Sequence, residues 1–283
     1  MIKEIKKVID LRCELAEIRK SKKKISLVPT MGNLHDGHLS LIDYARNISD
    51  YIVVSIFVNP TQFVAGEDFD KYPRTLDSDI KSISNLNVDL VFTPDIEEIY
   101  PVNDRTFVEA PVSELESIHC GKYRPGHFRG VATVVTKLFD IVKPDIAIFG
   151  EKDYQQLLII RHLVKSLLLP IEIIGLPTVR EKSGLAISSR NSYMSKSERQ
   201  QAPMLYECIR KTIKSIRSGD KDYSELEKKA KLFLKKAGFK IDYFNICDSC
   251  TLKTPTNENL VILAAVWLGK TRLIDNATTH TYD

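Results

Sequence analysis

Residues 27–38 read Leu27-Val28-Pro29-Thr30-Met31-Gly32-Asn33-Leu34-His35-Asp36-Gly37-His38, and this stretch decides how the fold is interpreted. The apolar run at 25–28 is typical of a buried strand, and a helical spacing of apolar residues follows over 38–48. A turn that contains two glycines and two histidines separates them. A strand, a short turn and a helix in this order form the repeating unit of parallel α/β sheets.

The same alternation continues as far as residue 174. Apolar runs predict strands at 51–58, 88–92, 146–149 and 171–174, and helical spacing predicts helices at 129–142 and 154–168. Pro144 and Pro170 follow the two helices, where a helix is expected to stop. The pattern favours a Rossmann-like, doubly wound parallel sheet with right-handed crossovers.

The pattern changes after about residue 180. Two lysine-rich amphipathic helices are predicted at 195–217 and 223–237, followed by strands at 241–247, 260–267 and 271–274. This order predicts a smaller α+β domain at the C-terminal end. We therefore expect a Rossmann-like domain at 1–178 and a second domain at 179–283.

The composition argues against a collagen-like protein, a disordered protein and a bundle of membrane helices. The chain has 283 residues, of which 43% are hydrophobic and 28% charged, and this is ordinary for a soluble globular protein. No run of about 18 apolar residues is present, and the first ten residues lack the apolar core of a secretory signal. Five scattered cysteines are typical of reduced thiols in the cytoplasm. The net charge of +4 is too small to predict nucleic-acid binding and is compatible with a small anionic substrate.

The turn at 31–38 has the chemistry of a phosphate site. It follows a predicted strand, and ligands of open α/β sheets bind at the carboxyl ends of the strands. The free N–H groups of the next helix favour phosphate, and Gly37 would allow a close approach. His35 and His38 could donate hydrogen bonds to phosphate oxygens. A metal site and a helix cap with incidental histidines are the alternatives, although two ligands alone do not form a zinc site.

Six segments together resemble the pantothenate synthetase (pantoate–β-alanine ligase) family. Two histidines in the pattern HxGH mark only a wide nucleotide-binding superfamily, which includes class I aminoacyl-tRNA synthetases and cytidylyltransferases. Six segments in the right order are much more specific. They are Pro29-Thr30-Met31-Gly32 through His35-Asp36-Gly37-His38, Ser55-Ile56-Phe57-Val58-Asn59-Pro60-Thr61-Gln62-Phe63, Tyr72-Pro73-Arg74-Thr75, Arg124-Pro125-Gly126-His127-Phe128-Arg129-Gly130, Gly150-Glu151-Lys152-Asp153-Tyr154-Gln155-Gln156 and Ser188-Ser189-Arg190-Asn191.

The resemblance implies a fold of the HxGH nucleotidyltransferase type and a two-step reaction in the cytoplasm. Pantoate and ATP, bound by the domain at 1–178, would give pantoyl adenylate and pyrophosphate. β-Alanine would then displace AMP to form pantothenate, a precursor of coenzyme A. The resemblance also implies a homodimer, and ATP chemistry implies Mg²⁺, for which the sequence identifies no protein ligands. No membrane or nucleic-acid partner is expected.

The resemblance also implies the site residues. His38, His35 and Lys152 would be catalytic, with His38 as the family's proton donor; adenylation itself transfers no proton, so an electrostatic role for His38 fits better. The uncharged amides of Gln62, Asn59 and Gln156 would bind pantoate and β-alanine. The ATP contacts would be Met31, Gly32, Asn33, Leu34, His35, Asp36, Gly37, His38, Gly150, Glu151, Lys152, Asp153, Val179, Ile187, Ser188, Ser189 and Arg190.

Three further patterns are interpreted without a catalytic role. Met194-Ser195-Lys196-Ser197 resembles the KMSKS loop of tRNA synthetases, but Ser195 followed by Glu198 predicts a capping box. Cys247 and Cys250 form a lone CxxC, which is weak evidence for zinc or redox chemistry. The segment 124–130 is either a wall of the active site, a mobile loop or a purely structural element.

Two other functions stay open at this point. A nucleotidyltransferase would join a nucleotide to a phosphorylated acceptor at the same phosphate pocket. An RNA-binding relative of tRNA synthetases would need a basic stripe with aromatic residues. Glu225 and Glu227 interrupt the lysines that could form such a stripe, at 211, 214, 228, 229, 231, 235 and 236.

Overall fold

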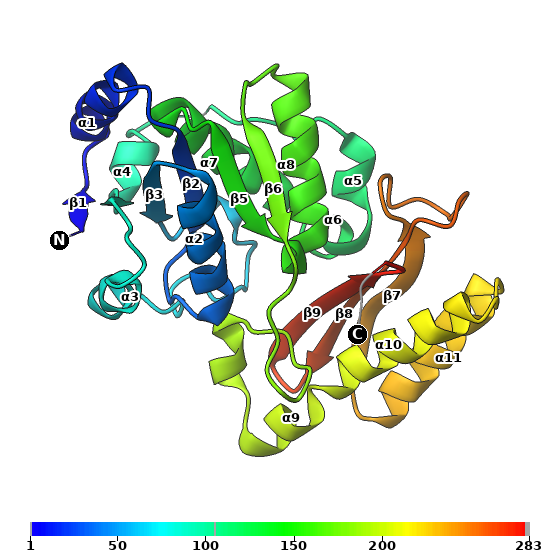
Figure 1. Cartoon of the computed structure of the whole chain (residues 1–283). Coiled ribbons are helices and arrows are strands. Elements are labelled where there is room, and N and C mark those ends of the chain that lie inside the picture. Colours follow the sequence, from blue (N-terminus) through cyan, green and yellow to red (C-terminus); the bar gives the residue numbers. More distant parts are fainter. Residues whose placement is uncertain (1, 105, 281–283) are drawn as a thin grey trace. The chain divides into compact units, whose positions relative to one another are not determined.

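The computed structural model describes residues 2–104 and 106–280. The chain divides into two compact units (Figure 1). The first consists of Met1–Glu151 and Gln156–Pro177, and the second of Lys152–Gln155 and Thr178–Asp283. The sequence division at residue 178 did not foresee that Lys152–Gln155 would group with the second unit.

The first unit is built on a six-stranded parallel sheet. Its order is β1 (Lys3–Ile5), β4 (Leu90–Phe92), β3 (Tyr51–Ile56), β2 (Ile25–Thr30), β5 (Ile146–Gly150) and β6 (Glu172–Leu176). The chain winds outward from β2 through β3 to β4, and then crosses back to β5 and β6 on the other side. The predicted doubly wound α/β fold is confirmed, and the point where the strand order reverses lies between β2 and β5.

Helices cover both faces of this sheet. Along β2, Leu27 points toward the core formed with α1 (Val8–Lys20), α7 (His127–Val142) and α8 (Tyr154–Ser166), whereas Val28 points toward α2 (Asp36–Ile48). Figure 1 shows α2 and α7 on opposite sides of the sheet. Successive residues of a strand face opposite ways, so a strand with helices on both sides is apolar throughout. This is why β2, β3 and β5 could be recognised in the sequence.

Several connections that begin in this unit are short helices that the sequence analysis did not predict. They are η1 (Pro60–Gln62), α3 (Leu76–Ile83), α4 (Ile96–Ile99), α5 (Ser113–Ser117), α6 (His119–Tyr123) and η2 (Glu151–Asp153), of which η1 and η2 are single 3₁₀ turns. The predicted strand at 51–58 ends earlier, at Ile56, and α2 begins at Asp36 rather than near His38. The early end of β3 lengthens the irregular segment at the carboxyl end of that strand.

The second unit contains an antiparallel sheet, β7 (Lys240–Asp248), β8 (Leu260–Leu268) and β9 (Thr271–Thr278). Its other elements are η3 (Ser189–Tyr193), α9 (Lys196–Gln201), α10 (Met204–Arg217) and α11 (Tyr223–Lys236). The single helix predicted at 195–217 is wrong, because the chain breaks into α9 and α10 around Pro203. Proline lacks the backbone N–H that a continuous helix needs and its ring crowds the preceding turn.

No helix within residues 2–104 and 106–280 is long and apolar enough to cross a membrane.

Candidate functional site

The turn after β2 is held in an unusual conformation by a buried carboxylate. Gly32 and Asn33 both adopt positive φ angles, +79° and +50°. The side chain of Asp79 on α3 is only 3% exposed and accepts hydrogen bonds from the backbone N–H groups of Asn33 (2.9 Å) and Leu34 (2.7 Å). Ionised acceptors bind backbone N–H groups strongly, so Asp79 fixes the shape of this turn.

Sequence reasoning missed Asp79. The available signal was its position on the buried face of α3, one turn before Ile83. An acidic side chain is seldom buried without a partner, and this one has the N–H groups of a turn 45 and 46 residues away. The spacing could have flagged a buried carboxylate but not the turn that it binds.

The two histidines lie at the start of α2. His35 is the N-cap residue and His38 is the third residue of the helix. Their rings stack with centroids 4.1 Å apart, and Nδ1 of His38 accepts the backbone N–H of His35 at 3.4 Å. A neutral imidazole that accepts at Nδ1 carries its proton on Nε2, so His38 presents Nε2–H as a donor. The cap prediction and the phosphate prediction are therefore compatible with the same geometry.

Gly37 lies close against the ring of His35. A Cβ atom built on Gly37 would lie 3.0 Å from both Nδ1 and Cε1 of the His35 ring. Contacts this short are tighter than almost all real ones, so a side chain here would displace the ring. The glycine thus keeps the two stacked histidines in place.

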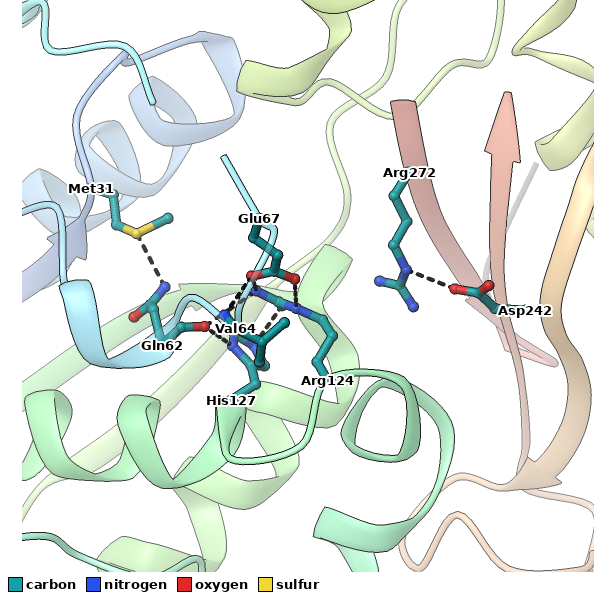
Figure 2. A network of polar contacts seen from close by, with 8 residues as sticks. All are labelled: Met31, Gln62, Val64, Glu67, Arg124, His127, Asp242 and Arg272. Atoms are coloured by element: carbon teal, nitrogen blue, oxygen red, sulfur yellow. Dashed lines mark hydrogen bonds and ion pairs between the residues drawn. The ribbon is translucent and has the colours of Figure 1, made fainter. Parts of the chain in front are cut away.

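The end of β3 brings Gln62 beside the turn that follows β2. Nε2 of Gln62 donates to Sδ of Met31 at 3.1 Å, as Figure 2 shows, and its Oε1 accepts from Nδ2 of Asn59 at 3.0 Å. Adjacent parallel strands with the register Thr30↔Ile56 place both segments at one edge of the sheet. Asn59 itself is 1% exposed, and its Oδ1 accepts from the hydroxyl of Tyr100 at 2.8 Å. Its amide is therefore used inside the protein, behind Gln62.

The end of β5 leads into η2, which carries Lys152. Nζ of Lys152 lies 3.2 Å from Oδ2 of Asp153, and the carbonyl oxygen of Lys152 accepts from Nδ2 of Asn276 at 2.9 Å. Lys152 and Asp153 belong to the second unit together with Asn276 on β9. Gly150 and Glu151 belong to the first unit, as does Gln156, which is partly buried near the start of α8.

The remaining predicted residues lie in one part of the second unit. The backbone N–H of Ile187 donates to the carbonyl of Val179 at 3.0 Å, so these two positions face each other. Ser188 caps η3, and its hydroxyl accepts the backbone N–H of Arg190 at 3.3 Å. Ser189 and Arg190 form the first turn of η3.

An ion pair lies immediately beside Val179. Arg180 donates from both terminal nitrogens to the carboxylate of Asp275, at 2.7 and 2.8 Å, and its guanidinium lies 3.4 Å from the centroid of the Tyr206 ring. Bidentate geometry fixes the guanidinium in one orientation. Neither Arg180 nor Asp275 was assigned a role from the sequence.

The interpretation of the 194–197 segment as a helix cap is confirmed. The hydroxyl of Ser195 accepts the N–H of Glu198 at 3.3 Å, and the Glu198 carboxylate accepts the N–H of Ser195 at 2.7 Å. Cys247 is buried in β7, and burial raises the pKa of its thiol to about 12. A thiol that stays protonated is a poor nucleophile and metal ligand. Among the residues that the structure describes, no three or more His, Cys, Asp or Glu side chains gather to hold a metal ion.

Comparison with known proteins gives consistent matches over nearly the whole chain. The sequence model of the family described as Pantoate-beta-alanine ligase matches residues 3–278. The chain is 50% identical over 278 residues to a pantothenate synthetase from Hahella chejuensis, covering 98% of each chain. It is 52% identical to one from Marinobacter nauticus, over 94% of this chain and 95% of the other.

Solved structures of the same group have the same fold. A pantothenate synthetase from Thermus thermophilus is 40% identical with a TM-score of 0.92, covering 99% of this chain and 100% of the other. A pantoate-beta-alanine ligase from Francisella tularensis, complexed with beta-gamma ATP and beta-alanine, is 38% identical with a TM-score of 0.81. That match covers 100% of this chain and 99% of the other. The resemblance found in the motifs is confirmed, and the chain belongs to the pantoate-beta-alanine ligase family.

Proposed function

We propose that this ligase condenses pantoate with β-alanine through a pantoyl adenylate, at the expense of ATP. The observation that carries the proposal is the contact between Gln62 and Met31 at 3.1 Å. Through this contact an amide suited to a hydroxy acid lies next to a turn suited to phosphate. The family supports the same substrates, as does the Francisella ligase, which is complexed with beta-gamma ATP and beta-alanine.

The reaction needs positioning and charge stabilisation more than bond-making by the protein. In the first step a carboxylate oxygen of pantoate bonds to the α-phosphorus, and the bond to pyrophosphate breaks. In the second step the amine of β-alanine bonds to the acyl carbon, the bond to AMP breaks, and the nitrogen loses a proton. Only the second step releases a proton, so we assign His38 the role of a donor to phosphate oxygens.

We assign the other residues from their positions and chemistry. Gln62 and Gln156 would bind pantoate and β-alanine, and Asn59 would act by holding the amide of Gln62, because its own amide is engaged internally. Lys152 would neutralise phosphate charge, with Asp153 orienting its ammonium. The backbone of the 31–38 turn and α2 would bind the phosphates. The remaining proposed ATP contacts are Gly150, Glu151, Val179, Ile187, Ser188, Ser189 and Arg190.

Magnesium would arrive as part of the substrate. The described residues offer no cluster of three or more typical metal ligands, and the Asp79 carboxylate is occupied by backbone N–H groups. Mg²⁺ that neutralises nucleotides is commonly held by phosphate oxygens and water, with few protein ligands. We therefore propose MgATP as the substrate rather than a resident metal.

We also propose that the protein is a cytoplasmic homodimer. Val102 and Phe107 of the first unit are apolar and are 80% and 46% exposed, so both side chains are available for contact with another chain. Free cysteines at five positions suit a reducing compartment. Light scattering on the purified protein would measure its mass in solution, and twice the 32.2 kDa of one chain is expected.

Product release tests the proposed function directly. The protein would be incubated with MgATP and pantoate, and β-alanine would be added last. Pyrophosphate release that requires pantoate, followed by AMP release that requires β-alanine, is the expected result. A phosphorylated acceptor that replaces pantoate would instead identify a nucleotidyltransferase.

Substitutions would then test the two central residues. His38→Ala should slow adenylate formation by about 10²- to 10³-fold, as for loss of one donor to developing charge. Gln62→Ala should weaken pantoate binding and leave ATP binding unchanged. His162→Ala on α8 is the control for loss of a histidine elsewhere in the first unit. Full pyrophosphate release by the His38 variant would refute its role.

A further inference from the structure

The segment 124–130, left open between a wall, a mobile loop and a structural element, contacts the turn that carries Gln62. It runs from the end of α6 into the first turn of α7. We infer that Glu67, Arg124 and His127 are positioning residues that hold the backbone carbonyl of Gln62 and so orient its amide for pantoate. The inference rests on the proposed function, because it takes Gln62 as the residue that binds pantoate.

His127 has a defined tautomer. Its side chain is buried, with Nδ1 at 2.7 Å from the carbonyl oxygen of Gln62 and Nε2 at 2.8 Å from Nη1 of Arg124 (Figure 2). A carbonyl oxygen can only accept and a guanidinium can only donate. The proton of His127 therefore lies on Nδ1, and the ring donates to Gln62 while it accepts from Arg124. Both nitrogens are engaged, so His127 is placed to orient Gln62 rather than to act as an acid or a base.

Arg124 is fixed in turn by Glu67. The two side chains form a bidentate pair, with Nε to Oε1 at 2.5 Å and Nη2 to Oε2 at 2.8 Å, and they are 14% and 21% exposed. Arg124 Nη2 also donates to the carbonyl of Gln62 at 3.3 Å, and Glu67 Oε2 accepts the backbone N–H of Val64 at 3.1 Å. The carbonyl of Gln62 thus receives two donors, one of them charged. The carboxylate that orients these donors is bonded to the same loop.

Helix α7 also packs closely against the turn that carries Gln62. A Cβ atom on Gly130 would lie 2.2 Å from the carbonyl oxygen of Thr61 and 2.7 Å from the backbone nitrogen of Gln62. Only glycine allows this approach. The carbonyl of Gly130 then accepts Nδ2 of Asn59 at 3.3 Å, and the same nitrogen donates to Oε1 of Gln62. The start of α7 therefore controls both the backbone of Gln62 and, through Asn59, its amide.

The turn needs this support because it is very short. η1 has three residues and cannot fix its own position through helical hydrogen bonds. A displacement of about 1 Å in a group that positions substrate can cost roughly 10²-fold in rate. The hydrogen bonds of Glu67, Arg124 and His127 prevent such a displacement of Gln62 before substrate binds.

Equilibrium binding separates positioning from general stability. Pantoate binding would be measured by calorimetry in the presence of a non-hydrolysable ATP analogue, and binding of the analogue would be measured alone. His127→Phe keeps the ring and removes the donor, and it should weaken pantoate binding about 10- to 100-fold while analogue binding is unchanged. His127→Asn can still donate near the Nδ1 position and should restore most of the affinity.

A second variant tests the inference if His127→Phe does not fold, and a matched control detects a general effect on stability. Glu67→Gln removes the charged partner of Arg124 and should also weaken pantoate binding selectively. Asp104→Asn breaks the pair between Asp104 and Lys137 of α7, whose side chains are similarly buried at 18% and 21% exposed but do not touch Gln62. This control should bind pantoate like the unsubstituted protein.

Each result would then decide the inference. Unchanged pantoate binding in His127→Phe, or in Glu67→Gln if the first variant does not fold, would overturn it. Equal weakening in Glu67→Gln and Asp104→Asn would also overturn it, because the effect would then be general. If the unsubstituted protein binds the analogue but no pantoate, the proposed function fails and the inference fails with it.

Discussion

Gln62 and Lys152 occupy equivalent positions after two strands of the parallel sheet and are supported in different ways. Each lies in a three-residue 3₁₀ turn that follows a strand, η1 after β3 and η2 after β5. The carbonyl of Gln62 accepts hydrogen bonds from His127 and Arg124, so one of its donors is a charged group. The carbonyl of Lys152 accepts from the neutral amide of Asn276, and the charged pair of Arg180 and Asp275 involves the preceding residue of β9.

The difference indicates how each turn should respond to change. Loss of charge near Gln62 should alter the orientation of that residue directly, because the charged group, Arg124, itself donates to the Gln62 carbonyl. Loss of charge near Lys152 should act through the stability of β9, because the donor itself is neutral. Three experiments test this contrast, beginning with the largest effect, and a fourth tests the cap of α9.

Arg180→Met should strongly destabilise the second unit. It leaves the Asp275 carboxylate, which is 3% exposed, without its charged partner. Breaking a buried pair from one side costs about 3–5 kcal/mol in free energy of unfolding. Denaturant unfolding would measure the loss. Arg199→Met is the control, since its pair with Glu181 is much more exposed and should contribute about 1 kcal/mol or less. Similar losses for the two variants would contradict the prediction.

The Gln62 support should weaken in acid, and Glu67 should be responsible. Burial alone would raise the pKa of Glu67, but the hydrogen bond and charge of Arg124 outweigh it and the pKa lies below the ordinary 4.5. A lowered folded pKa gives stability that is present above 4.5 and is lost as the pH falls through the folded value. The stability difference between the unsubstituted protein and Glu67→Gln should therefore shrink below that pH in thermal unfolding. A difference that stays constant would exclude this role for the carboxylate.

Asn276→Ala should weaken binding of the nucleotide and leave binding of pantoate unchanged. It removes one neutral hydrogen bond to Lys152, and a net loss of about 0.5–1.5 kcal/mol corresponds to roughly 2- to 12-fold weaker binding of an ATP analogue. Pantoate binding should be unchanged, opposite to His127→Phe. Asn245→Ala, which removes a hydrogen bond from a side-chain amide to the carboxylate of Glu227, is the control in the same unit. Weaker pantoate binding in Asn276→Ala would remove the contrast between the two turns.

Ser195→Ala should have no effect on catalysis. It removes the side-chain acceptor of the α9 cap and should lower the free energy of unfolding by about 1 kcal/mol. Adenylate formation should keep its rate, since the segment is a cap and not a catalytic loop. A large loss of pyrophosphate release, with the fold intact, would restore the interpretation as a KMSKS-type loop.

The sequence predicted the parts of the fold that local patterns encode. Strands β2, β3 and β5 are apolar on both faces and could be recognised, whereas β1 reads Lys-Glu-Ile and is stabilised by pairing with β4. The break at Pro203 was missed because α9 contains no apolar residue whose spacing could show where it ends and α10 begins.

The candidate site was predicted in the same way. Residues at strand ends, such as Gln62, could be singled out because parallel strands end at one edge. Their supports could not, because a hydrogen bond between distant residues leaves no pattern in a single sequence. Asp79, Glu67 and Asn276 contact partners 46, 57 and 124 residues away.

The spacing of these supports also sets an order of completion during synthesis. A ribosome delivers His127 65 residues after Gln62, so the first turn can be secured while much of the polypeptide is still unmade. Lys152 must await Asn276, which emerges 124 residues later on β9. A growing chain would therefore complete the supports of the 31–38 turn and of Gln62 early and the support of Lys152 late. An unfinished copy would still lack the hydrogen bond that holds the carbonyl of Lys152, the residue proposed to neutralise phosphate charge.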